Sequence, residues 1–205
     1  MPTRDMLDWE TEISKVVSNN SEEEIVVRGH RMSDLIGNTS FAGMMFLLLQ
    51  GRLPRDNEAR VLDALLVASA EHGIAPPSMI ARCFASYGTS IQAAVGGGII
   101  AFGDRMGGLG EELAKLMSET LATLAEGAGE AVEELCDEAL ATAACDLVER
   151  ATVRGERVPG YGIPLHGLDP RSPQVLAVAK RENTFGAHCR FAQQIEVALA
   201  NSRGG

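Results

Sequence analysis

The stretch Thr39-Ser40-Phe41-Ala42-Gly43-Met44-Met45-Phe46-Leu47-Leu48-Leu49-Gln50-Gly51 carries the strongest structural signal in this chain. Hydroxyl side chains at Thr39-Ser40 are typical of a helix N-terminus, because their oxygens accept hydrogen bonds from backbone N–H groups of the first turn. Gly51 is typical of a helix end. We therefore expect a strongly apolar helix from Phe41 to Gln50. Its apolar run is too short to span a bilayer, which needs about 18–20 residues.

The segments on either side continue the helical pattern. Leu53-Pro54-Arg55-Asp56 opens a second helix, in which apolar residues recur close to the helical period. On the N-terminal side, Glu24-Ile25-Val26-Val27-Arg28 is a short strand-like patch, and Ser33–Gly37 indicates a short capped helix. On the C-terminal side, Gly73 and Pro76-Pro77 are expected to break the chain.

A second apolar helix is predicted over about Ile91 to Phe102, and it contains Gly96-Gly97-Gly98. Each glycine costs about 1 kcal/mol relative to alanine in a helix. Close approach of another helix is the simplest compensation, because glycine lets two backbones meet. A phosphate-binding loop is not indicated, because no Lys-Ser/Thr pair follows the glycines.

The C-terminal half predicts further helices around one turn-dense segment. Helices are expected over 111–124, over the acidic and alanine-rich stretch 126–150 (one helix or a pair, interrupted at two glycines), over 172–180 and over 187–201. Residues 158–171 are rich in glycine and proline, and long loops inside compact domains tend to be functional. With only 4% aromatic residues, the composition favours helix over strand, so we expect an all-α fold of about eight or more helices.

Composition excludes several classes of protein. The 205 residues, 45% of them hydrophobic, suffice for one sizeable core or a core with a small lobe. A formal charge of −10 argues against nucleic-acid or anionic-membrane binding. Met1-Pro2-Thr3-Arg4-Asp5 has no basic region followed by an apolar stretch, so we expect no signal peptide and a cytoplasmic protein. The four cysteines lack metal-binding spacing and are expected to be free thiols, and we expect no metal or redox cofactor.

Three places concentrate polar residues or glycine within apolar surroundings. His72, in Glu71-His72-Gly73, is either a helix cap or core histidine or a ligand-binding group. Gly103–Gly108 contains an Asp-Arg pair that on its own reads as a surface ion pair. In Val158–Arg171, glycines expose backbone groups that can hydrogen-bond a flat ligand. Arg171 follows Asp169-Pro170, a rigid setting suited to two-pronged binding of a carboxylate.

These places, in this order and spacing, resemble the citrate synthase superfamily. The likeness is to its short citryl-CoA lyase branch, which is similar to the C-terminal module of ATP-citrate lyase. The matching stretches cover nearly the whole chain: Val27–Leu35, Leu47–Pro54, Ala70–Gly73, Ala85–Gly88 with Gly96–Gly98, Gly103–Gly108, and Val158–Gly162 through Asp169-Pro170-Arg171.

The resemblance implies a citrate synthase-like, α-helical homodimer formed by a single unit over residues 1–205. A large domain, about 1–110 with a contribution from the C-terminal helix, would carry the dimer interface, and a small domain, about 111–200, would close over the substrate. The family makes or breaks a carbon–carbon bond between an acyl-CoA and a 2-oxo acid. The implied ligands are a coenzyme A thioester and a small carboxylic acid.

The resemblance also implies roles for individual residues. His72 matches the family histidine that contacts the hydroxy acid or oxo acid, and Arg171 matches the arginine that binds its carboxylate. Gly107 falls where citrate synthases have a histidine that steadies the acetyl-CoA enol, and this difference resembles the lyase branch. The loop matching the one whose backbone surrounds the adenine of CoA consists of Val158, Pro159, Gly160, Tyr161 and Gly162.

Two departures from the family pattern bear on function. Ile163 stands where the family has a histidine, and isoleucine cannot donate a proton or a hydrogen bond. His166 is a candidate substitute, with a structural or surface role as the alternative. The chain ends at Asn201–Gly205, before the family segment that carries a catalytic aspartate, so we expect either a truncated sequence or a protein without the usual acid/base.

We therefore expect a citryl-CoA lyase-like enzyme. The alternative is a catalytically degenerate relative that keeps CoA binding or dimerisation, and unrelated acyl-CoA chemistry such as thioester hydrolysis is a third possibility.

Overall fold

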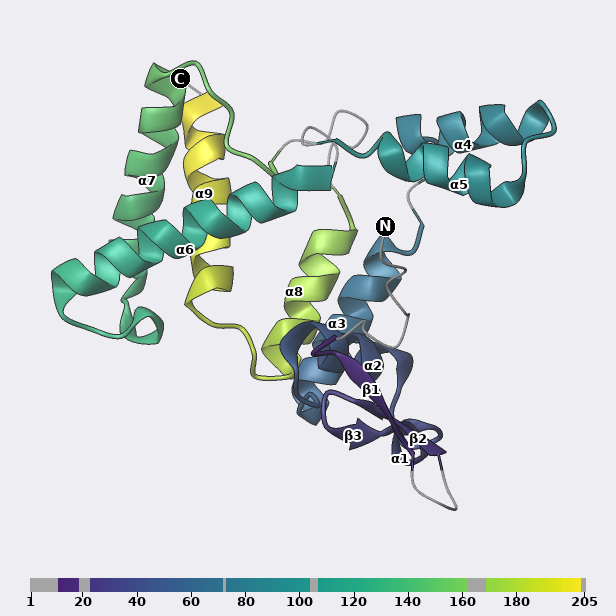
Figure 1. Cartoon of the computed structure of the whole chain (residues 1–205). Helices are drawn as coiled ribbons and strands as arrows, with labels where there is room; N and C mark the ends of the chain where they lie inside the picture. Colours follow the sequence, from purple (N-terminus) through teal and green to yellow (C-terminus); the bar gives the residue numbers. More distant parts are fainter. Residues whose placement is uncertain (1–10, 19–22, 72, 104–106, 162–168, 204–205) are drawn as a thin grey trace, which may run out of the picture. The chain divides into compact units, whose positions relative to one another are not determined.

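The computed structural model describes residues 11–18, 23–71, 73–103, 107–161 and 169–203 of the chain (Figure 1). These ranges hold nine α-helices, one short 3-10 helix and a three-stranded sheet. The helical class expected from the sequence is confirmed. No helix in the described ranges is long and apolar enough to cross a membrane.

A small antiparallel sheet precedes the first helices. Its strands are β1 (Ser14–Ser18), β2 (Glu23–Val27) and β3 (His30–Arg31), in the order β1-β2-β3. The tight turn between β2 and β3 depends on Arg28 and Gly29, whose φ angles of 47° and 85° are both positive. Paired positive φ values are typical of a two-residue hairpin turn, because they match the twist of the strands. The strand-like patch seen in the sequence is β2, whereas β1 was not anticipated.

Three helices follow the sheet: α1 (Met32–Leu35), α2 (Phe41–Gln50) and α3 (Asp56–Ser69). Helix α2 has the predicted bounds. Ser40 Oγ accepts a hydrogen bond of 3.0 Å from the Gly43 N–H, and the next residue after α2, Gly51, adopts a left-handed conformation. A small core of Val27, Leu35 and Leu47 joins the sheet to these helices.

Helices α4 (Pro76–Ser86) and α5 (Ile91–Ile100) form an antiparallel pair. The prolines Pro76-Pro77, expected only to break the chain, occupy the first turn of α4. Proline is tolerated there because the N–H groups of a first turn have no partner within the helix.

The glycine triplet in α5 allows the close approach that the sequence predicted. A Cβ on Gly98 would lie 3.0 Å from the carbonyl oxygen of Pro77, and one on Gly97 would lie 2.5 Å from the Phe84 ring. Gly96 faces open space, with nothing within 4 Å of such a Cβ. Gly98 is therefore favoured by its contact with the α4 backbone, whereas a side chain at Gly97 would displace the half-exposed ring of Phe84.

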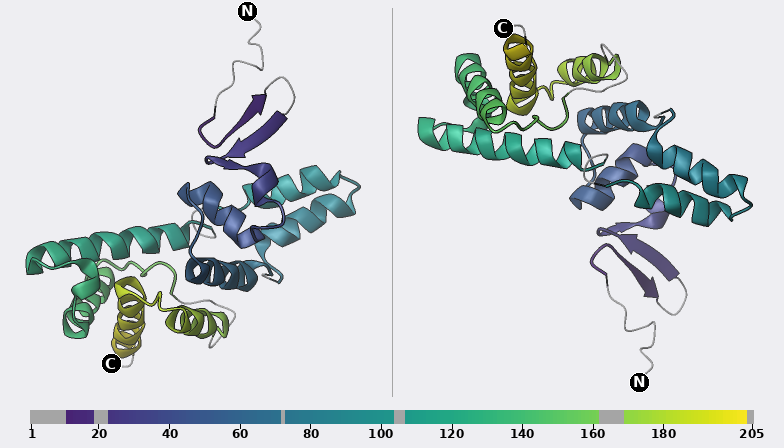
Figure 2. Two further views of the ribbon diagram at one scale, coloured as in Figure 1. Left: turned by 90° about the horizontal axis from the view of Figure 1, so that it is seen from below. Right: turned by 90° about the horizontal axis from the view of Figure 1, so that it is seen from above.

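The larger core forms where α6 (Leu109–Ala128), α7 (Asp137–Val153) and α9 (Ala187–Arg203) pack together. Helices α7 and α9 lie side by side, and α6 crosses them (Figures 1 and 2). The side chains that are fully buried here include Leu121, Leu140, Phe191 and Ile195. Helix α6 continues through Gly127 and ends before Gly129, and a 3-10 turn over Val132–Glu134 leads to α7.

By its internal contacts the chain divides into two compact units, which we call contact units. Helix α8 (Arg171–Arg181) has residues in both. One unit holds the chain up to Ala70 together with Ala177–Thr184, and the other holds Glu71–Leu176 together with the chain from Phe185. The large and small domains implied by the family resemblance, with a boundary near residue 110, stay a prediction.

Candidate functional site

The described part of the predicted adenine loop, the turn at Val158–Tyr161, is anchored in the larger core. Val158 is buried, with 5% of its surface exposed, and Tyr161 packs partly buried against the same core. Gly160 has φ 78°, and a Cβ at this position would lie 2.9 Å from Leu113 Cδ2. The left-handed backbone angle favours glycine here whatever the space, and a Cβ would in addition push the Leu113 side chain aside. The inward-facing side chains of Val158 and Tyr161 thus hold the turn in place.

Tyr161 ties this turn to α9. Its hydroxyl donates a hydrogen bond of 2.8 Å to the backbone carbonyl of Ala192. Burial and the negative charge of Glu196 raise the pKa of Tyr161 to about 12. Near neutral pH the phenol is therefore protonated and keeps its role as a donor.

A hollow of about 210 Å³ adjoins the turn. Val158 and Tyr161 line it together with the charged residues Glu156 and Arg157. Ligand pockets for drug-sized molecules span about 300–1,000 Å³. The hollow has room for a fragment of a large ligand such as a nucleotide base, and not for a whole coenzyme A.

Arg171 is the first residue of α8, and Asp169 orients its side chain. The Asp169 carboxylate accepts hydrogen bonds from Arg171 Nε at 2.9 and 3.2 Å and from Nη2 at 2.7 Å. It also accepts one from the Arg171 backbone N–H at 2.9 Å. This contact engages one edge of the guanidinium and does not involve Nη1. An arginine held in this way presents a pre-oriented positive charge, which suits recognition of a carboxylate.

Electrostatics connect Arg171 with the segment around the predicted histidine. The carboxylate of Asp169, and more weakly that of Glu71, raise the pKa of Arg171. Glu71 Oε1 accepts a hydrogen bond from the Gly73 N–H. His72 lies between these two residues but outside the described residues.

The predicted site is only partly described. Val158, Pro159, Gly160, Tyr161 and Arg171 are described, whereas His72, Gly162 and His166 lie outside the described residues. Ile163, which marks the departure from the family pattern, also lies outside them. Among the described residues, no group of three or more His, Cys, Asp or Glu side chains is arranged to hold a metal ion.

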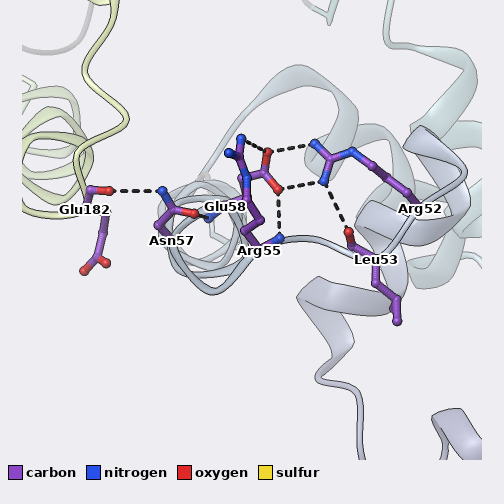
Figure 3. Close-up of polar contacts among 6 residues, drawn as sticks. All are labelled: Arg52, Leu53, Arg55, Asn57, Glu58 and Glu182. Carbon is purple, nitrogen blue, oxygen red and sulfur yellow. Dashed lines mark hydrogen bonds and ion pairs between the residues drawn. The ribbon is translucent and has the colours of Figure 1, made fainter.

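The role of Asp169 as the partner of Arg171 was not predicted from the sequence. The signal was present, because an aspartate side chain two residues before a helical N–H is a common local hydrogen-bond acceptor. At the other end of α8, Glu182 binds Asn57 (Figure 3) and Arg60 of α3, and no comparable sequence signal links these positions.

The helical architecture, the glycine-dependent turn of the predicted loop and the oriented arginine are compatible with the family that the sequence resembles. The sequence matches the family model of the citrate synthase C-terminal domain over residues 54–203, and the chain belongs to the citrate synthase family. A comparison with curated proteins finds no match.

Among solved structures, the chain is similar to citryl-CoA lyase from Hydrogenobacter thermophilus. The identity is 31% and the TM-score 0.79, and the alignment covers 96% of this chain and 70% of that one. The fold is also that of ATP citrate lyase from Methanothrix soehngenii, solved with citrate and coenzyme A, at 19% identity and a TM-score of 0.76. A Methanosaeta concilii ATP citrate lyase mutant, solved with (3S)-citryl-CoA, has 19% identity to this chain and a TM-score of 0.75. Each of these two alignments covers 98% of this chain but only 30% of the ATP citrate lyase chain.

Proposed function

We propose that this protein binds a coenzyme A thioester and a small carboxylic acid, and that it cleaves or forms the carbon–carbon bond between an acyl-CoA and a 2-oxo acid. The observation that carries the proposal is the similarity to citryl-CoA lyase over 96% of the chain at 31% identity. The Asp169-oriented guanidinium of Arg171 and the anchored turn at Val158–Tyr161 support it.

In the lyase direction, a base removes the hydroxyl proton of a carboxylated 3-hydroxyacyl-CoA. The bond to the acyl α-carbon breaks, and its electron pair forms the thioester enolate, which then takes up a proton. The products are a 2-oxo acid and an acyl-CoA. Negative charge develops on two oxygens, so the site must offer pre-oriented donors to both.

Each predicted residue has a place in this scheme. Arg171 binds the carboxylate of the acid, and His72 contacts its hydroxyl or oxo group. The backbone of Val158–Gly162 surrounds the adenine of CoA. His166 is the candidate for the proton-transfer role that Ile163 cannot fill.

The test is incubation of the protein with citryl-CoA and related hydroxyacyl-CoAs, with release of acetyl-CoA as the measurement. We expect turnover, and we expect Ile163→His to raise it if the family histidine is the missing acid. We expect Arg171→Gln to weaken citrate binding while leaving CoA binding close to wild type. Loss of both affinities together would indicate misfolding and would not support the assignment of Arg171.

One observation favours a second function. Ile163 removes a family proton donor, and loss of one general acid or base typically lowers the rate by about 10²–10⁴-fold. A CoA-binding or dimerisation partner without catalysis would show micromolar CoA affinity but no turnover of any hydroxyacyl-CoA. The same two measurements therefore separate the two functions.

We also propose that the protein is a homodimer that buries the α4–α5 pair. Helix α5 contains no charged residue. Exposed large apolar side chains gather on this pair and beside it: Met79, Ile80, Phe84, Tyr87, Ile91, Val95, Ile99, Ile100 and Phe102. An apolar hollow of about 430 Å³ on α4 is lined by Ile80, Cys83, Phe84 and Tyr87. An exposed apolar surface of this kind is typical of a protein interface.

Sedimentation velocity tests the dimer. We expect Ile99→Glu to dissociate it, because a charge would be buried without a partner. The matched control is Val153→Glu on α7, a position that is 81% exposed, and this variant should remain dimeric. A monomeric wild type at tens of micromolar would refute the dimer.

A further inference from the structure

The hollow beside the turn at Val158–Tyr161 is built entirely within one contact unit. Its other walls are formed by residues of α7 and α9: Val148, Ala151, Thr152, Leu199 and Ser202. The hydroxyls of Thr152 and Ser202 donate hydrogen bonds of 2.8 and 3.0 Å to carbonyls of their own helices. The hydroxyl protons of these walls are therefore engaged, and the charged groups that line the hollow come from Glu156 and Arg157.

The guanidinium of Arg157 is available to a ligand. Within the described part of the chain, Arg157 is the one basic residue that lines the hollow, and its side chain forms no hydrogen bond or ion pair. In the same contact unit, Arg171 and Arg190 bind the carboxylates of Asp169 and Asp137 at 2.7 and 2.8 Å. An arginine whose donors are free can bind a phosphate through two parallel hydrogen bonds.

Stabilisation of a helix end does not account for Arg157. Arg154 directly follows the last residue of α7, where a positive charge interacts favourably with the helix dipole. Arg157 lies further along the chain, outside the helix, and directly precedes the buried Val158. Because Val158 is anchored in the larger core, the backbone of Arg157 is held at the edge of the hollow.

Coenzyme A carries two kinds of phosphate near its adenine. The diphosphate continues into the pantetheine arm, which must lead away from the base to carry the thioester. The 3′-phosphate ends at the ribose and stays beside the base. A phosphate monoester carries about −1.5 to −2 charges at pH 7, and a chain with a formal charge of −10 repels it unless a local positive charge compensates. Arg157 offers such a charge at a hollow with room for the base.

We propose that Arg157 binds the 3′-phosphate of coenzyme A while the adenine occupies the hollow, so that the protein distinguishes coenzyme A from dephospho-coenzyme A. This inference rests on the proposed function, because it takes coenzyme A as the ligand. Glu156, which also lines the hollow, places a negative charge near the same phosphate. One residue of the pair thus strengthens binding of the 3′-phosphate and the other weakens it.

Isothermal titration of the full chain with CoA and with dephospho-CoA, which lacks only the 3′-phosphate, tests the proposal. We expect wild type to bind CoA about 10-fold more tightly than dephospho-CoA, the lower end of the range for hydrogen bonds to a charged group. Arg157→Gln should bind CoA as weakly as wild type binds dephospho-CoA, and its affinity for dephospho-CoA should match wild type. An equal loss for both ligands would overturn the contact with the 3′-phosphate.

Arg154→Gln is the matched control. It removes an exposed positive charge from the same segment, at a residue that does not line the hollow. The preference for CoA over dephospho-CoA should stay as in wild type. If the preference fell as far as in Arg157→Gln, the general charge of the segment would select the phosphate, and the proposed contact would be wrong.

Glu156→Gln should act in the opposite direction. Without this carboxylate, CoA affinity should rise about 2- to 5-fold, the size expected for one exposed charge acting on another. Dephospho-CoA affinity should change less, because the 3′-phosphate is missing. A lower preference for CoA in this variant would contradict the proposal.

Failure of this inference and failure of the proposed function give different results. If wild type binds neither ligand and turns over no hydroxyacyl-CoA, the proposed function fails and the inference fails with it. If wild type binds CoA and dephospho-CoA equally well, coenzyme A remains the ligand of the proposed function, and Arg157 does not bind the 3′-phosphate.

Discussion

The carboxylate of Asp169 accepts hydrogen bonds from both the side chain and the backbone N–H of Arg171, two residues further along the chain. The same contact stabilises the start of α8 and orients the guanidinium. Because the contact is local, the orientation of Arg171 within α8 does not depend on distant parts of the chain. The other end of α8 is held by contacts of a different kind, because Glu182 binds Asn57 and Arg60 of α3, far away in sequence.

Two substitutions separate the functions of Asp169. Asp169→Ala removes an acceptor from the first turn of α8, and such a loss costs about 1 kcal/mol of stability. Asp169→Asn keeps an oxygen that can accept from the Arg171 N–H, so it should cost less. Chemical denaturation of the two variants against wild type measures the difference. Equal losses in both would mean that the charge of Asp169, and not its role as an acceptor for the helix, carries the stability.

Local signals made much of the fold predictable. Helix α2 has its predicted bounds because Ser40 and Gly51 act within one turn of its ends. The sheet was harder to predict, because it needs the Arg28-Gly29 turn to pair strands whose outward residues are exposed. Val16 and Val17 of β1 are 61% and 45% exposed, so β1 lacks the alternation that identifies a half-buried strand.

Contacts between residues that are close in sequence could be predicted, whereas contacts between distant residues could not. Arg171 and Asp169 are neighbours in sequence, and their pairing follows from general rules for aspartate before a helix. Glu182 binds Asn57 and Arg60, which precede it by 125 and 122 residues. No periodicity or spacing in a single sequence links positions so far apart, because only the folded chain brings them together.

The α5 glycines give a matched pair of substitutions. Gly98→Ala places a Cβ 3.0 Å from the Pro77 carbonyl oxygen and 3.1 Å from Ala81 Cβ. Overpacking of this kind costs about 1–3 kcal/mol, and a backbone carbonyl cannot move aside easily. Gly96→Ala meets open space and should stabilise the helix by up to about 1 kcal/mol. In thermal unfolding, the melting temperature should be highest for Gly96→Ala, intermediate for wild type and lowest for Gly98→Ala. A stabilised Gly98→Ala would show that the α4–α5 pair is looser than its geometry implies.

Glu58 is expected to make stability depend on acid pH. Hydrogen bonds from Arg52 and Arg55 hold the pKa of Glu58 far below its usual range. A lowered folded-state pKa contributes stability above the unfolded pKa of 4.5, and this contribution is lost as pH falls. The stability difference between wild type and Glu58→Gln should therefore be largest near pH 7 and shrink on acidification below about pH 4.

Glu111→Gln is the control for Glu58. Its partner Lys115 lies 2.9 Å away, but the two side chains are 72% and 69% exposed. Exposed pairs of this kind contribute little to stability. The free energy of unfolding of Glu111→Gln should therefore equal that of wild type at every pH. If the free energies of unfolding of wild type and Glu58→Gln differed by the same amount at every pH, a role for the charge of Glu58 would be contradicted.

Tyr161 is expected to make stability depend on alkaline pH. Its pKa is raised from 10.0 to about 12, so the folded state holds the phenol proton more tightly than the unfolded state. This contribution is complete below the unfolded pKa and is lost as pH rises from about 10 to about 12. Tyr161→Phe removes both the titrating group and its hydrogen bond to Ala192, at a cost of about 1 kcal/mol near pH 8.

The difference between wild type and Tyr161→Phe should therefore narrow as the pH rises above 10. Because the chain has two tyrosines, Tyr87→Phe leaves Tyr161 as the one phenol whose ultraviolet absorbance reports ionisation. In that background, tyrosinate absorbance should rise together with unfolding, since the folded protein keeps Tyr161 protonated. Ionisation near pH 10 in a protein that is still folded would mean that water reaches the Tyr161 hydroxyl, and that the turn at Val158–Tyr161 is not held to α9 by this hydrogen bond.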